Sequence, residues 1–205
     1  MDRREFFRRS AGKAARTVTE HVNHKAQQNA AHWIRPPFAV DELDFLLACT
    51  RCKACTEACA YNVIFPLPAR RGVQVAATPV MDLLNRGCHL CQDWPCVQAC
   101  ETGALKRPVL EADEDEDPEA ETQALLWPKL ARVTIDEKNC LPYAGPECGA
   151  CRGSCPVPHA LLWKSEKPAI DEAVCTGCGL CREACIIEPR AIRVQSKYAA
   201  DQGVG

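Results

Sequence analysis

The chain has 205 residues, of which 47% are hydrophobic and 25% are charged, with a formal net charge of -2. This composition suits one or two compact domains and excludes an intrinsically disordered chain. Its longest uncharged runs fall short of the roughly 20 apolar residues that a membrane-spanning helix needs, so we expect no transmembrane segment.

The chain begins with a basic segment, residues 1–35, which carries eight Lys or Arg against three Asp or Glu. Arg3 and Arg4, followed by Phe6 and Phe7, resemble a twin-arginine export signal. A signal peptide also needs an apolar run of about 7–15 residues, and charged residues interrupt the stretch that follows the arginines. We therefore expect a basic, partly helical arm on a cytoplasmic protein, and the alternative is periplasmic export by the twin-arginine route.

Sixteen cysteines lie between positions 49 and 185, in four motifs of four. In a short secreted chain so many thiols would predict disulfides, whereas in a reducing compartment they predict metal binding. The first and fourth motifs are spaced C-x2-C-x2-C-x3-C, the second C-x2-C-x4-C-x3-C and the third C-x7-C-x2-C-x3-C. The motifs are Cys49, Cys52, Cys55 and Cys59; Cys88, Cys91, Cys96 and Cys100; Cys140, Cys148, Cys151 and Cys155; and Cys175, Cys178, Cys181 and Cys185.

The repeat extends beyond the cysteines. "VTIDEKNC" leads into the third motif and "PAIDEAVC" into the fourth, while "TGAL" follows the second and "RAIRV" the fourth. One supersecondary unit is thus used four times, and we expect each unit to be a short strand, a cysteine loop and a helical turn entered at the last cysteine. The expected fold class is α+β, with tandem bacterial-ferredoxin-like modules, rich in loops and stabilised by clusters, over residues 36–195. Residues 196–205 form the expected C-terminal tail.

Between the second and third motifs, residues 111–121 hold eight acidic residues in eleven. This run predicts a solvated insertion loop, and the alternative is a docking site for a basic partner.

The cysteine spacing predicts iron-sulfur clusters. C-x2-C-x2-C-x3-C is the ligand pattern of bacterial [4Fe-4S] ferredoxins, in which three close cysteines hold one cluster and the fourth reaches another. Small residues such as Gly177 and Gly179 let backbone N–H groups face the sulfides. Zinc sites usually draw on two separated pairs, so a third cysteine at another two-residue gap argues against zinc. All sixteen cysteines are therefore predicted iron ligands of four [4Fe-4S] clusters.

The spacing alone leaves the pairing of motifs open. Linear pairing joins the first motif to the second and the third to the fourth, with connections of 28 and 19 residues. Nested pairing joins the first to the fourth and the second to the third.

No catalytic constellation is found, so we do not expect an enzyme. The histidines are scattered, and His89, inside the second motif, is predicted to be a surface residue. Trp94, Trp127 and Trp163 are predicted to be packing residues. There is no glycine-rich nucleotide or phosphate loop and no basic patch near the motifs, so neither a nucleotide nor a nucleic acid is expected to bind.

Over roughly residues 33–194, the segments "RPP", "CHLCQDWPC", "CLPYAGPECGACRGSCPV" and "CTGCGLCREAC" resemble, in order, the NapG/MauM group of ferredoxin-type proteins of periplasmic nitrate reduction and methylamine utilisation. The resemblance implies an electron carrier between a quinol-linked membrane donor and a terminal oxidoreductase, with redox proteins as partners. Members of that group carry a twin-arginine leader, which residues 10–34 do not match. The alternative is an accessory protein for maturation of a partner metalloenzyme, and a cytoplasmic protein similar to the NapF group fits that reading.

The second and third motifs also resemble the iron-sulfur subunits of the dimethyl sulfoxide reductase class. That resemblance implies nested pairing, which is therefore our expectation. Its four ligand sets are Cys88, Cys91, Cys96 with Cys155; Cys140, Cys148, Cys151 with Cys100; Cys49, Cys52, Cys55 with Cys185; and Cys175, Cys178, Cys181 with Cys59.

Overall fold

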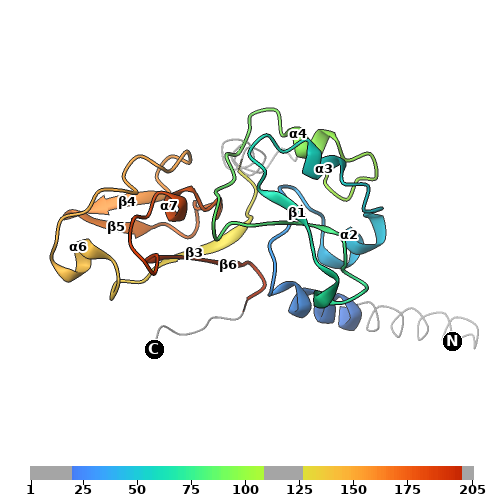
Figure 1. The fold of residues 1–205 in the computed structure, drawn as a ribbon, viewed down its shortest axis with the longest axis horizontal. Helices are drawn as coiled ribbons and strands as arrows, with labels where there is room; N and C mark the ends of the chain where they lie inside the picture. The colour runs from blue at the N-terminus through green and yellow to red at the C-terminus, as the bar shows by residue number, and fades with distance from the viewer. Residues whose placement is uncertain (1–19, 109–126, 200–205) are drawn as a thin grey trace, which may run out of the picture.

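The computed structural model describes residues 20–108 and 127–199 (Figure 1). The acidic insertion, the first part of the basic arm and the end of the tail lie outside these residues. Residues 20–30 form the first described helix. The elements that follow are α2 (Glu42–Ala48), α3 (Ala54–Glu57), β1 (Ile64–Pro66), η1 (Ala69–Arg71), β2 (Pro79–Met81), α4 (Pro95–Gln98), β3 (Ala131–Ile135), α6 (Leu141–Ala144), β4 (Leu161–Lys164), β5 (Lys167–Ile170), α7 (Leu180–Glu183) and β6 (Ile192–Ser196).

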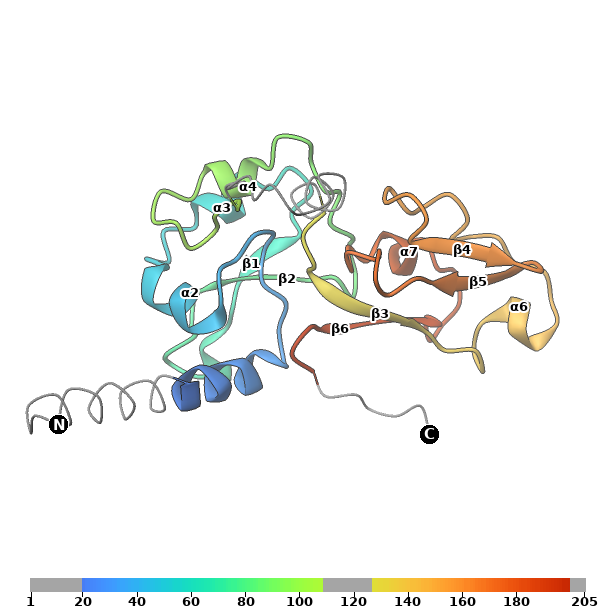
Figure 2. The same ribbon diagram turned by 180° about the vertical axis from the view of Figure 1, so that it is seen from behind.

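The described chain forms two halves that lie side by side, residues 20–108 and residues 127–199 (Figures 1 and 2). We call them the first half and the second half. Each contains short helices and antiparallel strands, so the expected mixture of helix and strand is confirmed. Each half also holds two consecutive cysteine motifs.

Strand pairing closes each half around its own two motifs. In the second half β4, after the third motif, pairs with β5, before the fourth, and β3 pairs with β6 outside them. In the first half β1 pairs with β2 in the position that corresponds to β4–β5. The counterpart of the β3–β6 ladder is a single antiparallel bridge between Ala39 and Leu105. The same closure is therefore built twice, with a shorter outer ladder in the first half.

The helical turns differ from the expected ones. We expected each turn to begin at the fourth cysteine, but α3, α4 and α7 contain the third cysteines Cys55, Cys96 and Cys181, and each ends before the fourth. A residue in the left-handed region immediately precedes each of these helices, and each helix begins one residue before the third cysteine. In the third motif the helix α6 instead covers the first four residues of the seven-residue gap after Cys140.

The first half is stabilised by a buried ion pair. The Arg35 guanidinium donates from Nε and Nη2 to both carboxylate oxygens of Glu42, at 3.0 and 2.6 Å, and from Nη1 to the Thr78 hydroxyl at 2.8 Å. The guanidinium carbon also lies 4.4 Å from the centre of the Phe45 ring. This bidentate geometry satisfies charges that would otherwise be costly to bury.

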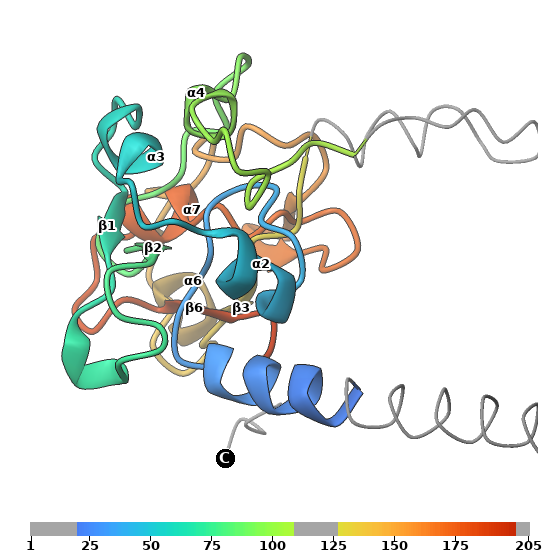
Figure 3. The ribbon, with the colours of Figure 1, turned by 90° about the vertical axis from the view of Figure 1, so that its right-hand side faces the viewer.

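The helix of residues 20–30 packs below α2 (Figure 3). Its last residue, Ala30, is fully buried, and its carbonyl accepts a 2.7 Å hydrogen bond from the Ser196 hydroxyl at the end of β6. Trp33 and Arg35 are buried as well. The packed body thus includes the end of the segment that we expected to be an arm.

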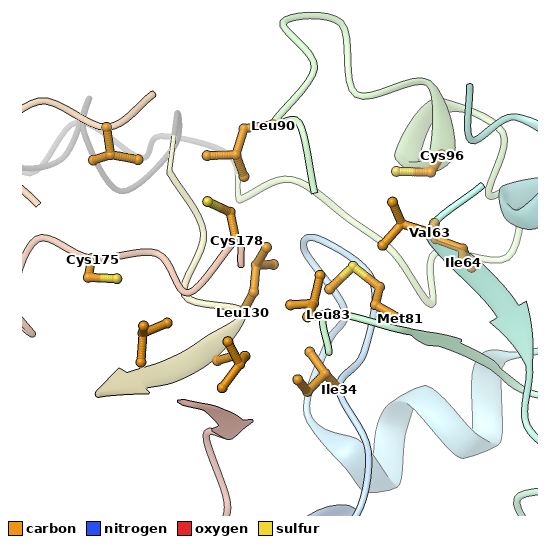
Figure 4. Packing of buried hydrophobic residues seen from close by; sticks show 14 of the residues in the cluster. Ile34, Val63, Ile64, Met81, Leu83, Leu90, Cys96, Leu130, Cys175 and Cys178 are labelled. Atoms are coloured by element: carbon orange, nitrogen blue, oxygen red, sulfur yellow. The ribbon is translucent and has the colours of Figure 1, made fainter. Parts of the chain in front are cut away.

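Buried residues from both halves form one continuous cluster (Figure 4). The cluster joins Leu83 and Leu90 of the first half to Leu130 and Cys178 of the second. Among the described residues, no helix has the length and apolar character that crossing a membrane requires.

Candidate metal centres

The sixteen thiols gather in four groups, each with three cysteines from one motif and one from the neighbouring motif. In each group, burial raises the pKa of one cysteine, the third of its motif. The charges of two or three other cysteines of the same group raise that pKa further. We call the groups site A (Cys49, Cys52, Cys55 and Cys100), site B (Cys88, Cys91, Cys96 and Cys59), site C (Cys175, Cys178, Cys181 and Cys155) and site D (Cys140, Cys148, Cys151 and Cys185).

This grouping is the linear pairing, and our expectation of nested pairing is wrong. The fourth cysteines Cys59 and Cys100 exchange places between sites A and B, and Cys155 and Cys185 exchange places between sites C and D. The strand pairs explain this outcome, because they close each half around consecutive motifs. The resemblance of the second and third motifs to another class of subunits therefore did not extend to their pairing.

Left-handed residues aim the third cysteine of three motifs into its site. The residues before α3, α4 and α7 are Lys53, Trp94 and Gly179, with φ angles of 67°, 47° and 80°. The first two are not glycines, and a non-glycine residue in this region costs conformational energy. Sequence reasoning found only Gly179, because nothing in the local composition marks Lys53 or Trp94 as left-handed.

The repeated "IDE" before the third and fourth motifs builds the turn into the first cysteine. The Asp136 carbonyl accepts the Cys140 N–H at 2.9 Å, and the Asp171 carbonyl accepts the Cys175 N–H at 2.8 Å. The carboxylate of each aspartate accepts a further N–H two residues on, at 3.2 Å for Asp136 and 3.0 Å for Asp171. Such Asx turns position the cysteine without help from a regular helix or strand.

Backbone N–H groups donate to the fourth cysteines of the first half. Val63 donates to Cys59 Sγ at 3.5 Å and Leu105 to Cys100 Sγ at 3.3 Å. Burial acts to raise the pKa of the Cys100 thiol, but hydrogen bonds from Leu105 and Thr102 outweigh it and the pKa is lowered. Donors of this kind stabilise a thiolate and tune the potential of a bound iron-sulfur cluster. Sequence reasoning missed both donors, although each follows its cysteine by four or five residues.

The buried thiols need a positive partner to ionise. Burial, followed by the charges of neighbouring thiols, raises the pKa of Cys96 to about 12 and that of Cys151 to about 11. Burial also raises the pKa of Cys88 to about 12. Iron binds the thiolate form, so metal binding at these positions must release protons. All sixteen cysteines are free thiols.

The residues around site B fit a bound cluster. Cys59 from the first motif lines one cavity together with the first three cysteines of the second motif, and Val63, Ile64 and Trp94 form apolar walls. Within residues 20–108 and 127–199, no three cysteine, histidine or acidic side chains converge on a position for a single metal ion. The four ligands of a four-iron cluster each bind a different iron, so they need not converge on one point.

The glycine at position 177 allows a close approach at site C. Gly177 has a φ of 80°, and a Cβ built there would lie 2.1 Å from the carbonyl oxygen of Ala131. Only glycine lets the loop between Cys175 and Cys178 pack against the start of β3. This close packing is a second role for Gly177, beside the predicted one of letting backbone N–H groups face the sulfides.

The histidine and tryptophans singled out in the sequence have structural partners. His89 is exposed, as predicted for a surface residue, and it stacks on Tyr61 with ring centres 3.5 Å apart. Trp94 is buried and meets Phe38 edge-on at 5.0 Å. The Arg152 guanidinium lies 4.5 Å from the ring centre of Trp163.

Comparison with known proteins identifies related chains. The ferredoxin-type protein NapG of Escherichia coli is 30% identical over 203 residues, which cover 93% of this chain and 82% of NapG. The methylamine utilization ferredoxin-type protein MauM of Methylobacillus flagellatus is 34% identical over 174 residues, which cover 80% of this chain and 69% of MauM. The ferredoxin-type protein NapF of Escherichia coli is 31% identical over 168 residues, 77% of this chain and 83% of NapF.

No family model and no solved structure matches the chain. The relatives nevertheless match most of its length, and the resemblance noted in the motifs is confirmed. The protein therefore belongs to the NapG/MauM group of ferredoxin-type proteins, a family of iron-sulfur electron carriers.

Proposed function

We propose that sites A to D each hold one [4Fe-4S] cluster and that the protein passes single electrons along them. The observation that carries this proposal is the division of sixteen thiols into four groups of four, each completed by a cysteine from the neighbouring motif. This exchange of the fourth ligand is the arrangement of two-cluster ferredoxins. In this proposal each half is one such module, and the chain is an electron carrier rather than an enzyme.

The bound clusters supply reversible one-electron chemistry, and the residues around them influence their reduction potentials. Cysteine thiolates hold the irons, while the N–H groups of Val63 and Leu105 stabilise negative charge on two of the sulfurs. The apolar walls around site B limit solvent access and so influence the potential.

The test is the content of iron, acid-labile sulfide and zinc per chain in protein purified without oxygen, with EPR spectra after reduction. About sixteen irons with magnetically interacting signals support four clusters. Zinc without sulfide would refute the proposal.

The ligand assignment has its own test in Cys91→Ala. This variant should lose one cluster or convert it to a three-iron form, and should be less stable because metal binding and folding are coupled. A Cys91→Ala sample that retains all iron would refute the assignment at site B.

The proposed partners are redox proteins, with a quinol-linked membrane donor at one end and a terminal oxidoreductase at the other. We propose a cytoplasmic location, with twin-arginine export as the alternative. Fusion of residues 1–40 to an export reporter distinguishes the two, because only an exported fusion gives reporter activity outside the cytoplasm.

One observation favours a second role, in maturation of a partner metalloenzyme. Of the sixteen cysteines, Cys52 at site A is the one that is exposed, and an exposed ligand favours release of a cluster. Transfer of iron and sulfide from the protein to an apo-enzyme, without loss from the other sites, would support this role.

A further inference from the structure

We propose that electrons cross between the two halves at the contact of Gly87 and Cys88 with residues 178–183, so that the sites act in the order A, B, C, D. This inference rests on the proposed electron transfer and adds its route. The crossing places one loop of the first half against the cysteine loop and helix α7 of the second.

One short link between the halves joins two cysteines. The Cys88 N–H of site B donates to the Cys178 carbonyl of site C at 2.7 Å. One hydrogen bond thus connects the backbones of two proposed ligands that belong to different halves. A continuous path of covalent bonds and one hydrogen bond runs from one sulfur to the other.

Further contacts hold this loop in place. The Gly87 N–H donates to the Glu183 carboxylate at 2.7 Å, and the Arg182 guanidinium donates from Nε to the Leu84 carbonyl at 2.9 Å. Three donors therefore anchor consecutive parts of one loop to one short segment. Leu83, Leu90, Leu130 and Cys178 pack in the buried cluster that joins the two halves (Figure 4), while Leu84 and Glu183 on the same two segments are exposed.

The approach of the two segments requires a glycine. A Cβ built on Gly87 would lie 2.6 Å from the Leu180 side chain and 2.8 Å from Leu180 Cα. Because the second contact is to backbone, a rotamer change at Leu180 cannot relieve it. Any larger residue at position 87 must therefore separate the loop from α7 and lengthen the Cys88–Cys178 hydrogen bond.

The electrostatic neighbours of the thiols support the order of the sites. The charge of Cys55 at site A raises the pKa of Cys96 at site B, and the charge of Cys151 at site D raises the pKa of Cys181 at site C, in both cases after burial. Between the halves, the charge of Cys178 adds to the effect of burial in raising the pKa of Cys88. Sites B and C are thus the inner pair, and sites A and D are the outer ones.

With clusters bound, the cysteines of sites B and C would hold the donor and the acceptor of this one-electron transfer, in which the group at site B would be oxidised and the group at site C reduced. No covalent bond forms or breaks, and the electron comes from an external one-electron donor that acts at one of the outer sites. Leu47 and Ile186 mark the two outer ends, because each is strongly exposed and lies within two residues of a cysteine of site A or site D.

The experiment is voltammetry of the cluster-loaded full chain, attached to a maleimide electrode through a Leu47→Cys substitution. Electrons then enter near site A and must cross the junction to reach sites C and D. At slow scan rates the full charge should be recovered. Adding Gly87→Ala should leave this slow charge unchanged but remove about half of it at fast scan rates, because two of the four proposed clusters lie beyond the junction.

Gly149→Ala is the matched control. Like Gly87, Gly149 is directly adjacent to a cysteine, but its Cβ would meet nothing within 4 Å. This variant should keep the full charge at every scan rate at which the parent does. When the protein is attached through Ile186→Cys in place of Leu47→Cys, Gly87→Ala should again lose about half of the charge at fast scan rates, because sites A and B then lie beyond the junction. Protein without an introduced cysteine gives the background.

Equal scan-rate dependence in Gly87→Ala and Gly149→Ala would overturn the route and leave the proposed function intact. Absence of any charge in the parent at slow scan rates would instead refute electron transfer itself. If Gly87→Ala does not assemble its iron, Glu183→Ala decides, because it removes the anchor of the Gly87 N–H without a steric clash. Loss of charge at fast scan rates in that variant supports the route, and full charge overturns it.

Discussion

The two halves use the same plan with different means of stabilisation. The second half leads into both of its motifs with an "IDE" turn and closes on the five-residue β3–β6 ladder. The first half enters its first motif from α2 and closes on the single Ala39–Leu105 bridge. Where the first half lacks the ladder, it has the Arg35–Glu42 pair and large buried side chains such as Phe45.

This difference shows how a cysteine-rich module can obtain its stability from two sources. The largest fully buried side chains lie mostly in the first half, whereas the second half buries smaller aliphatic residues and its cysteines. Apolar burial stabilises a fold without metal, but a small core needs ligand bonds to complete it. We therefore expect the halves to respond unequally when either source is removed.

The largest effect should follow removal of iron. Treatment with a chelator under mild oxidation should unfold the second half, while the segment around Phe45 and the Arg35–Glu42 pair retains part of its structure. Hydrogen exchange measured by mass spectrometry separates the halves by peptide. Equal loss of protection in residues 30–83 and residues 127–199 would contradict the comparison.

The next effect should come from the buried ion pair. Arg35→Met leaves the Glu42 carboxylate buried without its partner, so it should lower the free energy of unfolding by about 3–5 kcal/mol. The control is Arg152→Met in the second half, where the pair with Glu166 is 52% and 83% exposed and is expected to contribute about 0–1 kcal/mol. Anaerobic urea unfolding of the loaded protein measures both. Similar values for the two variants would contradict the assigned role of burial.

A smaller effect should appear where the halves are joined. Ser196→Ala removes the buried hydrogen bond to the Ala30 carbonyl and should cost about 0.5–1.5 kcal/mol, the net contribution of one hydrogen bond, because that carbonyl still accepts the Trp33 N–H at 3.3 Å. Faster hydrogen exchange in residues 20–30, with unchanged exchange around β4 and β5, is the expected signature. An unchanged exchange rate in residues 20–30 would mean that this bond does not hold the helix in place.

The smallest effect concerns pH and Asp136. Hydrogen bonds from Asn139 and then Arg193 hold the pKa of the Asp136 carboxyl below its usual value. A lowered folded pKa contributes stability above the unfolded pKa of about 3.9, and this contribution is lost as the pH falls through the folded pKa. Between pH 8 and 5, Asp136→Asn should therefore change the level of stability but not its slope with pH.

Stopped-flow acid jumps extend the stability measurement to lower pH, because they are complete before the clusters are slowly lost. Below about pH 4 the parent should lose the Asp136 contribution while Asp136→Asn does not. Asp171→Asn is the matched control, since Asp171 accepts the corresponding turn hydrogen bond from Ala173. A slope between pH 8 and 5 that disappears in Asp136→Asn would contradict the assignment.

Much of the candidate site follows from local sequence. The cysteine spacing and the repeated flanks predicted four similar units, and the family resemblance that they carry is confirmed by relatives along most of the chain. Local patterns were enough because three cysteines of each site come from one motif and lie close together in the chain. The assignment of the sixteen cysteines as iron ligands remains a prediction.

The remaining features depend on residues that are far apart in the chain. Local sequence was enough to find the motifs, their repeated "IDE" flanks and the family, since these depend on neighbours a few residues apart. The tertiary structure decided that Cys59 joins the second motif and Cys155 the fourth, because strand pairing sets which loops face each other. It alone also placed Cys88 against Cys178, because only packing of one half on the other brings residues ninety positions apart into hydrogen-bond contact.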